Sequence, residues 1–578
     1  MTSVVLAWLA AGTIVIGGAA VRAGQQVAAA EPADLIVLNG KVVTVDARAS
    51  VAEAVAIRGG RIIAVGDAAS VRARTGPATR VIDARGRTVI PGLIDSHVHA
   101  LGAAPVEAVR PFRTLSSVGD LQAWLRDEAR RAPGTGWIWS PRVYPTRLAE
   151  GRFPTRAELD AAVPDRPVVA DGAYAFVLNT AALRTAGITA TSADPAGAQV
   201  VRDPGGEPTG LVRNARSVLA RYLPPATDAL PLDQIEALHR VYLQSGITSV
   251  VERGGTVEGY RAYEALKTTG RLHVRATVTL MLPAGLQPAD ADRVIASLPL
   301  QPGQGDDRLK VGPLKLTVDG GILLGTSFMR EPYGQSSRAL YGVQDARYRG
   351  FLSTTPDVIH AGIKAGHARG WQMTAHVTGD AGVDVVLDAF EAAQRAHPRA
   401  DPRHTLIHAY FPTPEVAHRV ATLGVLVDTQ PAWLFKDGDA LRAALGPQRL
   451  ARFIGVRTWR DAGARVAINT DHMFGADRDT AMNPFNPFLT MATAVSRRTE
   501  SGQVVGAGER VTRDEALRMM TIDAAALSFD EADRGSIEVG KLGDLVILSD
   551  DLLTVPEARL RTITADMTIV GGVVVFEK

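Results

Sequence analysis

Residues 89–99 read Val-Ile-Pro-Gly-Leu-Ile-Asp-Ser-His-Val-His, an apolar run that ends in two histidines. A short apolar run bounded by turn-forming residues is typical of a buried strand, so we expect a strand over 89–95. Side chains alternate along a strand, so His97 and His99 face the same way and offer two imidazole nitrogens to one ion. The stretch therefore predicts a metal site at the end of a strand.

Seven further apolar runs follow along the chain, and helix-like segments such as 356–366 and 381–397 separate most of them. Strands that alternate with helices are typical of parallel α/β folds, and eight strand–helix units predict a (β/α)8 barrel of the TIM type. We expect this barrel to occupy residues 89–505. The seven further runs are 247–251, 274–280, 314–318, 372–375, 405–407, 425–427 and 465–468.

The first two predicted strands are separated by a long stretch, from about residue 100 to 246. It is too long for one strand-to-strand crossover, and its residues 194–210 are rich in proline and glycine. We therefore expect an inserted subdomain after the first barrel strand.

Both ends of the chain contain short β-like runs. Near the N-terminus, Asn39-Gly40 lies between the runs 35–38 and 41–45, which predicts a hairpin. Near the C-terminus, residues 543–548 read as a strand, and Gly571-Gly572 divides a second predicted hairpin over 567–576. We expect one small β-sandwich built from both termini, from 31–88 and from 506–578, the latter part also holding the last barrel helices.

The first thirty residues differ in composition from the rest. Residues 4–21 are uncharged and apolar, and Val27-Ala28-Ala29-Ala30 resembles a small-residue cleavage site. They predict a signal peptide over 1–30 and an exported protein, periplasmic or secreted. An uncleaved membrane anchor or a misassigned start codon are the alternatives. No later stretch is long and apolar enough to span a bilayer, so we expect no stable membrane partner after cleavage.

Composition narrows the function classes. The net charge of +2 and the absence of a long basic block argue against a dedicated nucleic-acid-binding protein. The chain has no cysteine, which excludes disulfides, thiolate zinc sites and a cysteine nucleophile. Any metal must therefore be held mainly by histidines and carboxylates.

In a barrel of this type the catalytic groups lie at the C-terminal ends of the strands. Nitrogen and carboxylate ligands suit zinc or a similar divalent ion. Lys315 lies on the fourth strand and is a candidate metal ligand. The alternative is that its side chain pairs with Asp319 or another carboxylate. The side chains that stand at or near the ends of the predicted strands, and are therefore candidate ligands, are His97, His99, Lys315, His376, His408 and Asp471.

Several motifs occur in order over nearly the whole chain, and together they resemble the amidohydrolase superfamily, in particular the amidohydrolase family 3 branch called YtcJ-like. They are Pro91-Gly92-Leu93-Ile94-Asp95-Ser96-His97-Val98-His99, Asn179-Thr180-Ala181-Ala182-Leu183, Leu314-Lys315-Leu316-Thr317-Val318-Asp319-Gly320, His376-Val377-Thr378-Gly379-Asp380, Asn469-Thr470-Asp471 and the segment 535–544.

The resemblance implies one or two divalent metal ions, with zinc the expected metal, and it implies how their ligands are shared. His97, His99 and Asp471 would hold a buried metal, His376 and His408 would hold a second, and Lys315 would bridge the two as an N-carboxylated lysine. A metal-activated hydroxide would attack the substrate carbonyl. Asp471 would act as general base, taking the proton of the water and passing it to the leaving nitrogen.

The predicted activity is hydrolysis of a non-peptide C–N bond in an amide, N-acyl amine or N-formyl amine. The alternatives are a deaminase or an ester or lactone hydrolase on the same metal site, and a binding protein that kept the barrel but lost activity. We expect a small-molecule substrate, and a homodimer is left open. Four polar side chains are predicted to contact the substrate: Tyr174, Glu252, Asp319 and Gln430.

Two of these positions depart from the pattern of the relatives. Tyr174 stands where relatives often have histidine, and Val251-Glu252 stands where they often have His-Asp. Tyr174 would donate a hydrogen bond to an oxyanion or pack as a plain aromatic, and Glu252 would line the pocket or pair with Arg253. The departures concern the choice of substrate rather than the metal ligands.

Overall fold

A computed structural model describes residues 31–195, 197–214, 216–223 and 230–578. Its central sheet has eight parallel strands in the order β20-β19-β18-β17-β16-β15-β14-β8. The strands are β8 (Leu93–Val98), β14 (Ile247–Gly255), β15 (Arg275–Met281), β16 (Leu309–Thr317), β17 (Met373–Val377), β18 (Thr405–His408), β19 (Leu426–Thr429) and β20 (Val466–Ile468). Each contains or overlaps one of the eight predicted runs, which confirms the (β/α)8 barrel. The predicted signal peptide over 1–30 lies outside the described residues.

The first and last strands meet just beyond β20. Val98 and His472 form a parallel bridge, and the backbone N–H of His99 donates to the His472 carbonyl oxygen at 2.8 Å. These contacts close the ring of strands, and they bring the two ends of the predicted ligand series together.

Helices between the strands cover the outside of the ring. α12, for example, buries Val383, Val386, Leu387 and Phe390, a spacing of three to four residues that turns one apolar face to the barrel. The longer helices that follow barrel strands are α7 (Leu232–Gln244), α8 (Val257–Thr268), α11 (Pro356–Ala368), α12 (Asp380–Ala396), α13 (Pro414–Thr422), α14 (Pro431–Leu445) and α17 (Pro487–Ser496). Among the described residues, a helix both long and apolar enough to cross a membrane is not found.

Two sheets from the chain ends pack as a sandwich. One has the order β5-β4-β1-β6, and the other has the order β23-β22-β21-β7-β2-β3. The second sheet combines strands from both termini, and the apolar core between the sheets confirms the predicted sandwich. The strands are β1 (Leu35–Leu38), β2 (Lys41–Val43), β3 (Val51–Ala52), β4 (Ala54–Arg58), β5 (Arg61–Gly66), β6 (Arg80–Asp83), β7 (Thr88–Pro91), β21 (Leu545–Leu548), β22 (Ala565–Val570) and β23 (Val573–Glu577).

The hairpin predicted at Asn39-Gly40 is wrong. Strand β1 pairs with β4 on one edge and with β6 on the other, so neither edge is left for β2, which pairs with β3 and β7 in the second sheet. Asn39 adopts a left-handed φ of 54°, and its side-chain amide donates to Asp83 Oδ1 at 3.1 Å. The turn carries the chain from one sheet to the other. The hairpin predicted at Gly571-Gly572 is present as β22 and β23.

The strand predicted over 89–95 is two strands. β7 ends at Pro91 in the sandwich, and β8 begins at Leu93 in the barrel. Gly92 lies between them against Thr248, where a Cβ atom would lie 2.2 Å from Thr248 Oγ1. Only glycine fits this contact without a shift of the neighbour, so the chain passes directly from the sandwich into the first barrel strand.

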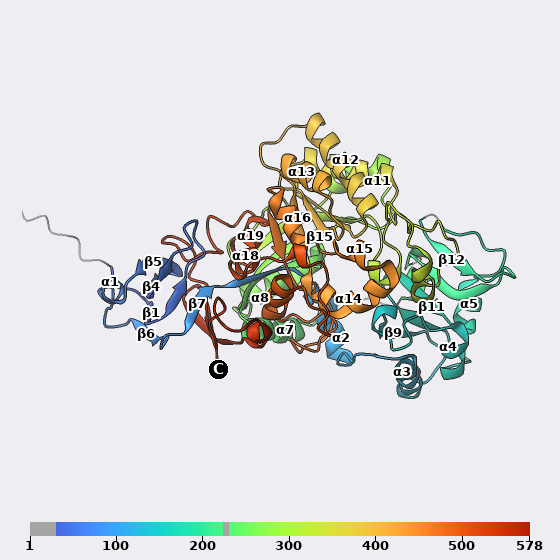
Figure 1. The fold of residues 1–578 in the computed structure, drawn as a ribbon, viewed down its shortest axis with the longest axis horizontal. Helices are drawn as coiled ribbons and strands as arrows, with labels where there is room; N and C mark the ends of the chain where they lie inside the picture. Colours follow the sequence, from blue (N-terminus) through green and yellow to red (C-terminus); the bar gives the residue numbers. More distant parts are fainter. Residues whose placement is uncertain (1–30, 196, 215, 224–229) are drawn as a thin grey trace, which may run out of the picture.

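The predicted inserted subdomain lies between β8 and β14, and it is drawn in teal on the side of the barrel away from the sandwich (Figure 1). Its sheet has the order β12-β13-β11-β10-β9 around a core that includes Phe176 and Val212. Its elements include α2 (Ala100–Val109), α3 (Val118–Arg131), α4 (Arg156–Ala162), α5 (Thr180–Ala186), β9 (Ile138–Arg142), β10 (Val168–Asp171), β11 (Ala175–Leu178), β12 (Gln199–Arg202) and β13 (Pro208–Arg213).

A buried ion pair joins the inserted subdomain to the barrel. Arg147 lies in a short 3-10 helix (Pro145–Arg147), and its Nε and Nη2 donate to the two carboxylate oxygens of Asp437 on α14 at 3.0 and 2.8 Å. Thr146 Oγ1 donates to the same carboxylate at 2.7 Å. Since Asp437 is fully buried, its charge depends on these donors.

Replacing Arg147 with methionine should therefore lower the free energy of unfolding by about 3 kcal/mol, because it leaves the Asp437 carboxylate buried without a counter-ion. Urea unfolding followed by tryptophan fluorescence measures this. Arg130→Met removes an exposed arginine paired with Asp127 and should change the free energy by less than about 1 kcal/mol. Equal effects of the two substitutions would contradict the expected role of the buried pair.

Candidate active site

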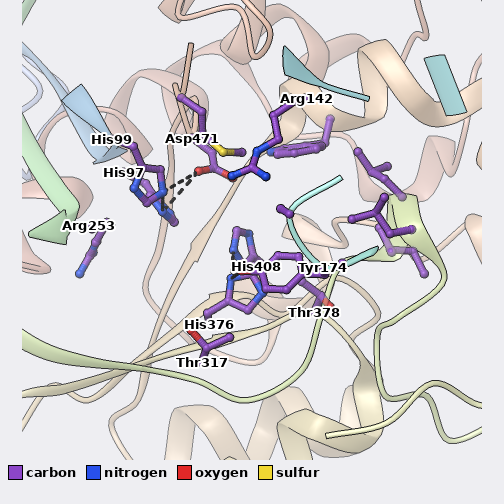
Figure 2. Close-up of a pocket in the computed structure, with 18 of the residues that line it drawn as sticks. His97, His99, Arg142, Tyr174, Arg253, Thr317, His376, Thr378, His408 and Asp471 are labelled. Atoms are coloured by element: carbon purple, nitrogen blue, oxygen red, sulfur yellow. Dashed lines mark hydrogen bonds and ion pairs between the residues drawn. The ribbon is translucent and has the colours of Figure 1, made fainter. Parts of the chain in front are cut away.

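A cavity of about 320 Å³ lies at the carboxyl ends of the barrel strands, and Figure 2 shows the side chains around it. Barrel strands and the inserted subdomain both contribute to its walls. All six predicted metal ligands line this one cavity: His97, His99, Lys315, His376, His408 and Asp471.

The first three ligand atoms converge on one point. His97 Nε2 and His99 Nε2 lie 3.1 Å apart, and Asp471 Oδ1 lies 3.4 Å from the first and 3.3 Å from the second. Two ligands of a tetrahedral zinc ion with bonds of about 2.05 Å are separated by about 3.3 Å. Asp471 Oδ1 is buried and has no hydrogen-bond partner among the described residues. The group therefore fits one divalent ion.

The other two histidines form a second group. His376 Nε2 lies 2.9 Å from the Gly320 carbonyl oxygen, and His408 Nδ1 lies 2.7 Å from Gln430 Oε1. Each acceptor requires a proton on the nitrogen that faces it, so both remaining nitrogens carry lone pairs. These nitrogens, His376 Nδ1 and His408 Nε2, lie 2.8 Å apart. A cation between or beside them would remove the repulsion of the two lone pairs.

Burial keeps these imidazoles neutral. It holds the pKa of His97 and of His408 well below the usual value, and it lowers the pKa of His376 to about 3, with the nearby Lys315 charge acting in the same direction. A neutral imidazole has the lone pair that a metal ligand needs, whereas imidazolium has none. At neutral pH these imidazoles are therefore in the protonation state that binds a metal ion.

Lys315 lies near the end of β16 and is almost fully buried. Burial lowers the pKa of its amine to about 8, although the charge of Asp471 opposes this. The structure does not pair it with Asp319, because that carboxylate accepts the backbone N–H groups of Thr378, Phe328 and Gly379 at 2.8 to 2.9 Å. An amine that readily loses its proton can act as a nucleophile or ligand.

The profile of the Amidohydrolase family matches residues 80–576, a span that includes every barrel strand and the sandwich strands from β6 onward. The chain belongs to the amidohydrolase family. It is therefore a hydrolase of carbon–nitrogen bonds and acts on a small-molecule substrate.

Relatives of this amidohydrolase match it over nearly their whole length. N-substituted formamide deformylase of Arthrobacter pascens is 31% identical over 562 residues, which are 94% of this chain and 98% of the relative. The Bacillus subtilis protein YtcJ, named as an amidohydrolase, is 26% identical over 541 residues, which are 91% of this chain and 96% of YtcJ. A solved metal-dependent hydrolase of Pyrococcus horikoshii has the same fold, with a TM-score of 0.64, 23% identity and coverage of 91% of this chain and 99% of the other.

Two candidate ligands of the amidohydrolase have unusual backbone conformations. Asp471 has a φ of 51° and His408 a φ of 77°, both in the left-handed region that non-glycine residues rarely adopt. Neighbouring side chains hold them there: Asn483 Nδ2 donates to the Asp471 carbonyl oxygen at 2.5 Å, and Thr429 Oγ1 donates to that of His408 at 2.9 Å. Strain of this kind is concentrated at functional sites.

Of the four residues predicted to contact substrate, the structure places only Tyr174 on the cavity wall. Its hydroxyl lies 3.5 Å from His376 Nδ1, and burial raises the pKa of its phenol, so it remains a donor at neutral pH.

The other three lie behind the cavity wall. Glu252 Oε2 accepts the Leu101 N–H at 2.9 Å, at the start of α2, and its Oε1 lies 4.0 Å from His99 Nδ1. Gln430 accepts from the back of His408, and Asp319 holds the loop after β17 through the backbone bonds described above. Gln430 thus orients a ligand imidazole, and Glu252 lies beside another, rather than facing the cavity.

Other cavity residues have no counterpart in the sequence prediction. Tyr410 follows His408 by two residues, and Phe474 follows Asp471 by three. Their closeness to predicted ligands in the sequence could have indicated them. Arg142 on β9 and Trp433 on α14 carried no such signal, because neither follows a predicted ligand. The cavity residues that the sequence did not indicate include Arg142, Tyr144, Thr317, Ile322, Leu323, Leu324, Tyr410, Trp433 and Phe474.

Proposed function

We propose that the enzyme cleaves the C–N bond of an amide, N-acyl amine or N-formyl amine with one or two divalent metal ions, of which zinc is the expected one. The observation that carries this proposal is the convergence of six ligand-type side chains on one cavity. The name of the Arthrobacter relative supports N-formyl amines as the first substrates to test.

In this proposal His97, His99 and Asp471 would hold one ion, His376 and His408 would hold the other, and Lys315, as a carbamate, would supply oxygen ligands. When bound, the ions would lower the pKa of a water molecule to about 7 and polarise the substrate carbonyl. Asp471 accepts the proton of the water on the carboxylate oxygen that does not face the imidazoles, and it returns that proton to the leaving nitrogen. Tyr174 donates a hydrogen bond to the carbonyl oxygen, where negative charge develops.

The test is a metal analysis combined with a substrate panel. The purified protein, loaded with zinc and dialysed, should retain one or two zinc ions per chain and hydrolyse N-formyl amines or N-acyl amines. A protein that never retains metal would contradict the proposal and favour a non-catalytic barrel. Zinc retention with turnover of esters, lactones or amino-purines alone would keep the metal site and change the reaction.

Lys315→Ala should lower kcat/KM by about 100-fold or more, because it removes the group that joins the two halves of the site. Native mass spectrometry of the unsubstituted protein should show a carboxyl adduct that acid removes. Lys364→Ala, which removes an exposed lysine of α11, should leave both activity and adduct unchanged. Full activity of Lys315→Ala would rule out the bridging role.

A further inference from the structure

In the part of the chain that the structure describes, three cationic side chains line the cavity, and the proposed function uses only one of them. Lys315 belongs to the ligand group. Arg253 lies on the barrel strand β14, where its Nε donates to the Ser96 carbonyl oxygen and its Nη2 to Asp428 Oδ2, both at 2.8 Å. Arg142 has no assigned role; it comes from the end of β9 in the inserted subdomain, and Figure 2 shows its guanidinium among the cavity side chains.

Among the described residues, one edge of the Arg142 guanidinium has no hydrogen-bond partner. Its Nη1 donates to Asp171 Oδ1, an oxygen that also accepts the Ala173 N–H at 2.8 Å. Its Nε is buried without a hydrogen-bond partner, and within the described part of the chain its Nη2 makes no hydrogen bond to protein either. The N–H bonds of Nε and Nη2 point the same way and form the fork that accepts a carboxylate through two parallel hydrogen bonds.

We infer that this free edge of Arg142 binds a carboxylate of the substrate, so that the enzyme acts on amides or N-formyl amines that carry a carboxylate away from the scissile bond. This inference rests on the proposed function. A bound carboxylate would satisfy the Nε–H, which otherwise stays buried and unpaired.

The surroundings favour a carboxylate over a more highly charged group. Asp171 already shares the guanidinium, and its negative charge would repel a phosphate dianion more strongly than a carboxylate monoanion. Phe474 supports the guanidinium, whose central carbon lies 5.7 Å from the ring centre. Apolar side chains make up much of the remaining wall, including Ile322, Leu323 and Leu324, and they suit an apolar part of the substrate beside its carboxylate and amide.

A matched pair of substrates tests the inference: N-formylphenylalanine and N-formyl-2-phenylethylamine differ only by the carboxylate. We expect the zinc-loaded enzyme to have at least tenfold higher kcat/KM for the first. The variant Arg142→Met with Asp171→Asn removes the guanidinium without leaving its carboxylate partner charged. It should lower kcat/KM for N-formylphenylalanine by about 10- to 100-fold, as expected for a charged bidentate hydrogen bond, and change the value for the other compound less than threefold.

Asp171→Asn alone is the control, and it should keep the preference for the carboxylate. Equal losses of kcat/KM on both substrates would overturn the inference, because Arg142 would then act only through its structural contact with Asp171. A fall in kcat for both compounds with KM unchanged would also overturn it, since Arg142 would then act on the transition state. A preference of the unsubstituted enzyme for the neutral compound would do the same.

Binding separates this inference from the proposed function. The same two compounds are titrated calorimetrically into the zinc-loaded Asp471→Asn protein, which by the proposed mechanism turns them over about 10³-fold more slowly. Tighter binding of N-formylphenylalanine, lost when Arg142→Met and Asp171→Asn are added, supports the carboxylate site even if neither compound is hydrolysed by the enzyme. Equal binding of the two compounds, or no binding of either, overturns it.

Discussion

Asp471→Asn should lower kcat by about 10³-fold while zinc remains bound. Asp471 is the only carboxylate among the described residues that line the cavity, so no other carboxylate is placed to receive the proton of the attacking water. An asparagine oxygen can still face the two imidazoles, but an amide cannot take up the proton or return it to the leaving nitrogen. The measurement is kcat on an N-formyl amine, with zinc content determined on the same sample.

A matched control is Asp388→Asn, which neutralises a largely exposed carboxylate on α12 and should leave kcat unchanged. A fully active Asp471→Asn protein would refute the role of Asp471 as base. Loss of zinc together with activity would assign Asp471 to the ligand set without showing that it transfers a proton.

Replacing His97 and His99 together with alanine should abolish activity and the retention of zinc at that site. The substitutions remove two of the three atoms that converge at 3.1 to 3.4 Å, and Asp471 with the proposed Lys315 carbamate provides too few ligands to hold the ion. Ligand binding stabilises the native state, by about 4 kcal/mol when zinc is present at 1,000 times its dissociation constant. Added zinc should therefore raise the Tm of the unsubstituted protein more than that of the double variant.

The control for this experiment is His418→Ala, which removes an exposed histidine of α13 and should keep both zinc and activity. A double variant that still retains its full zinc content and turns over substrate would show that the ion lies elsewhere.

The barrel could be predicted because its strands are short apolar runs, buried and separated by amphipathic helices. The ligands could be predicted because they follow those runs at the end of the barrel where catalytic groups collect. The hairpin at Asn39-Gly40 failed for a long-range reason: the local turn signal competes with β4 and β6, which occupy both edges of β1. The residues around a turn do not show whether distant strands will occupy both edges of the strand before it.

Side-chain direction was the other part that the sequence did not determine. Glu252, Asp319 and Gln430 lie near strand ends, as expected, but each is turned toward a backbone group or an imidazole instead of the cavity. Arg142 was not predicted because it lies in the inserted subdomain, outside the barrel strands and their helices. Only the folded sheet of that subdomain brings it to the cavity.

The contact between Val98 and His472 closes the barrel where its first and last strands meet. His99 follows the first strand and Asp471 follows the last, so the proposed metal would link the two segments that close the barrel. A growing polypeptide would hold the two histidines long before their carboxylate partner is synthesised. Metal loading would then have to wait for nearly the whole chain, and release of the metal would be an early sign that the ring is opening.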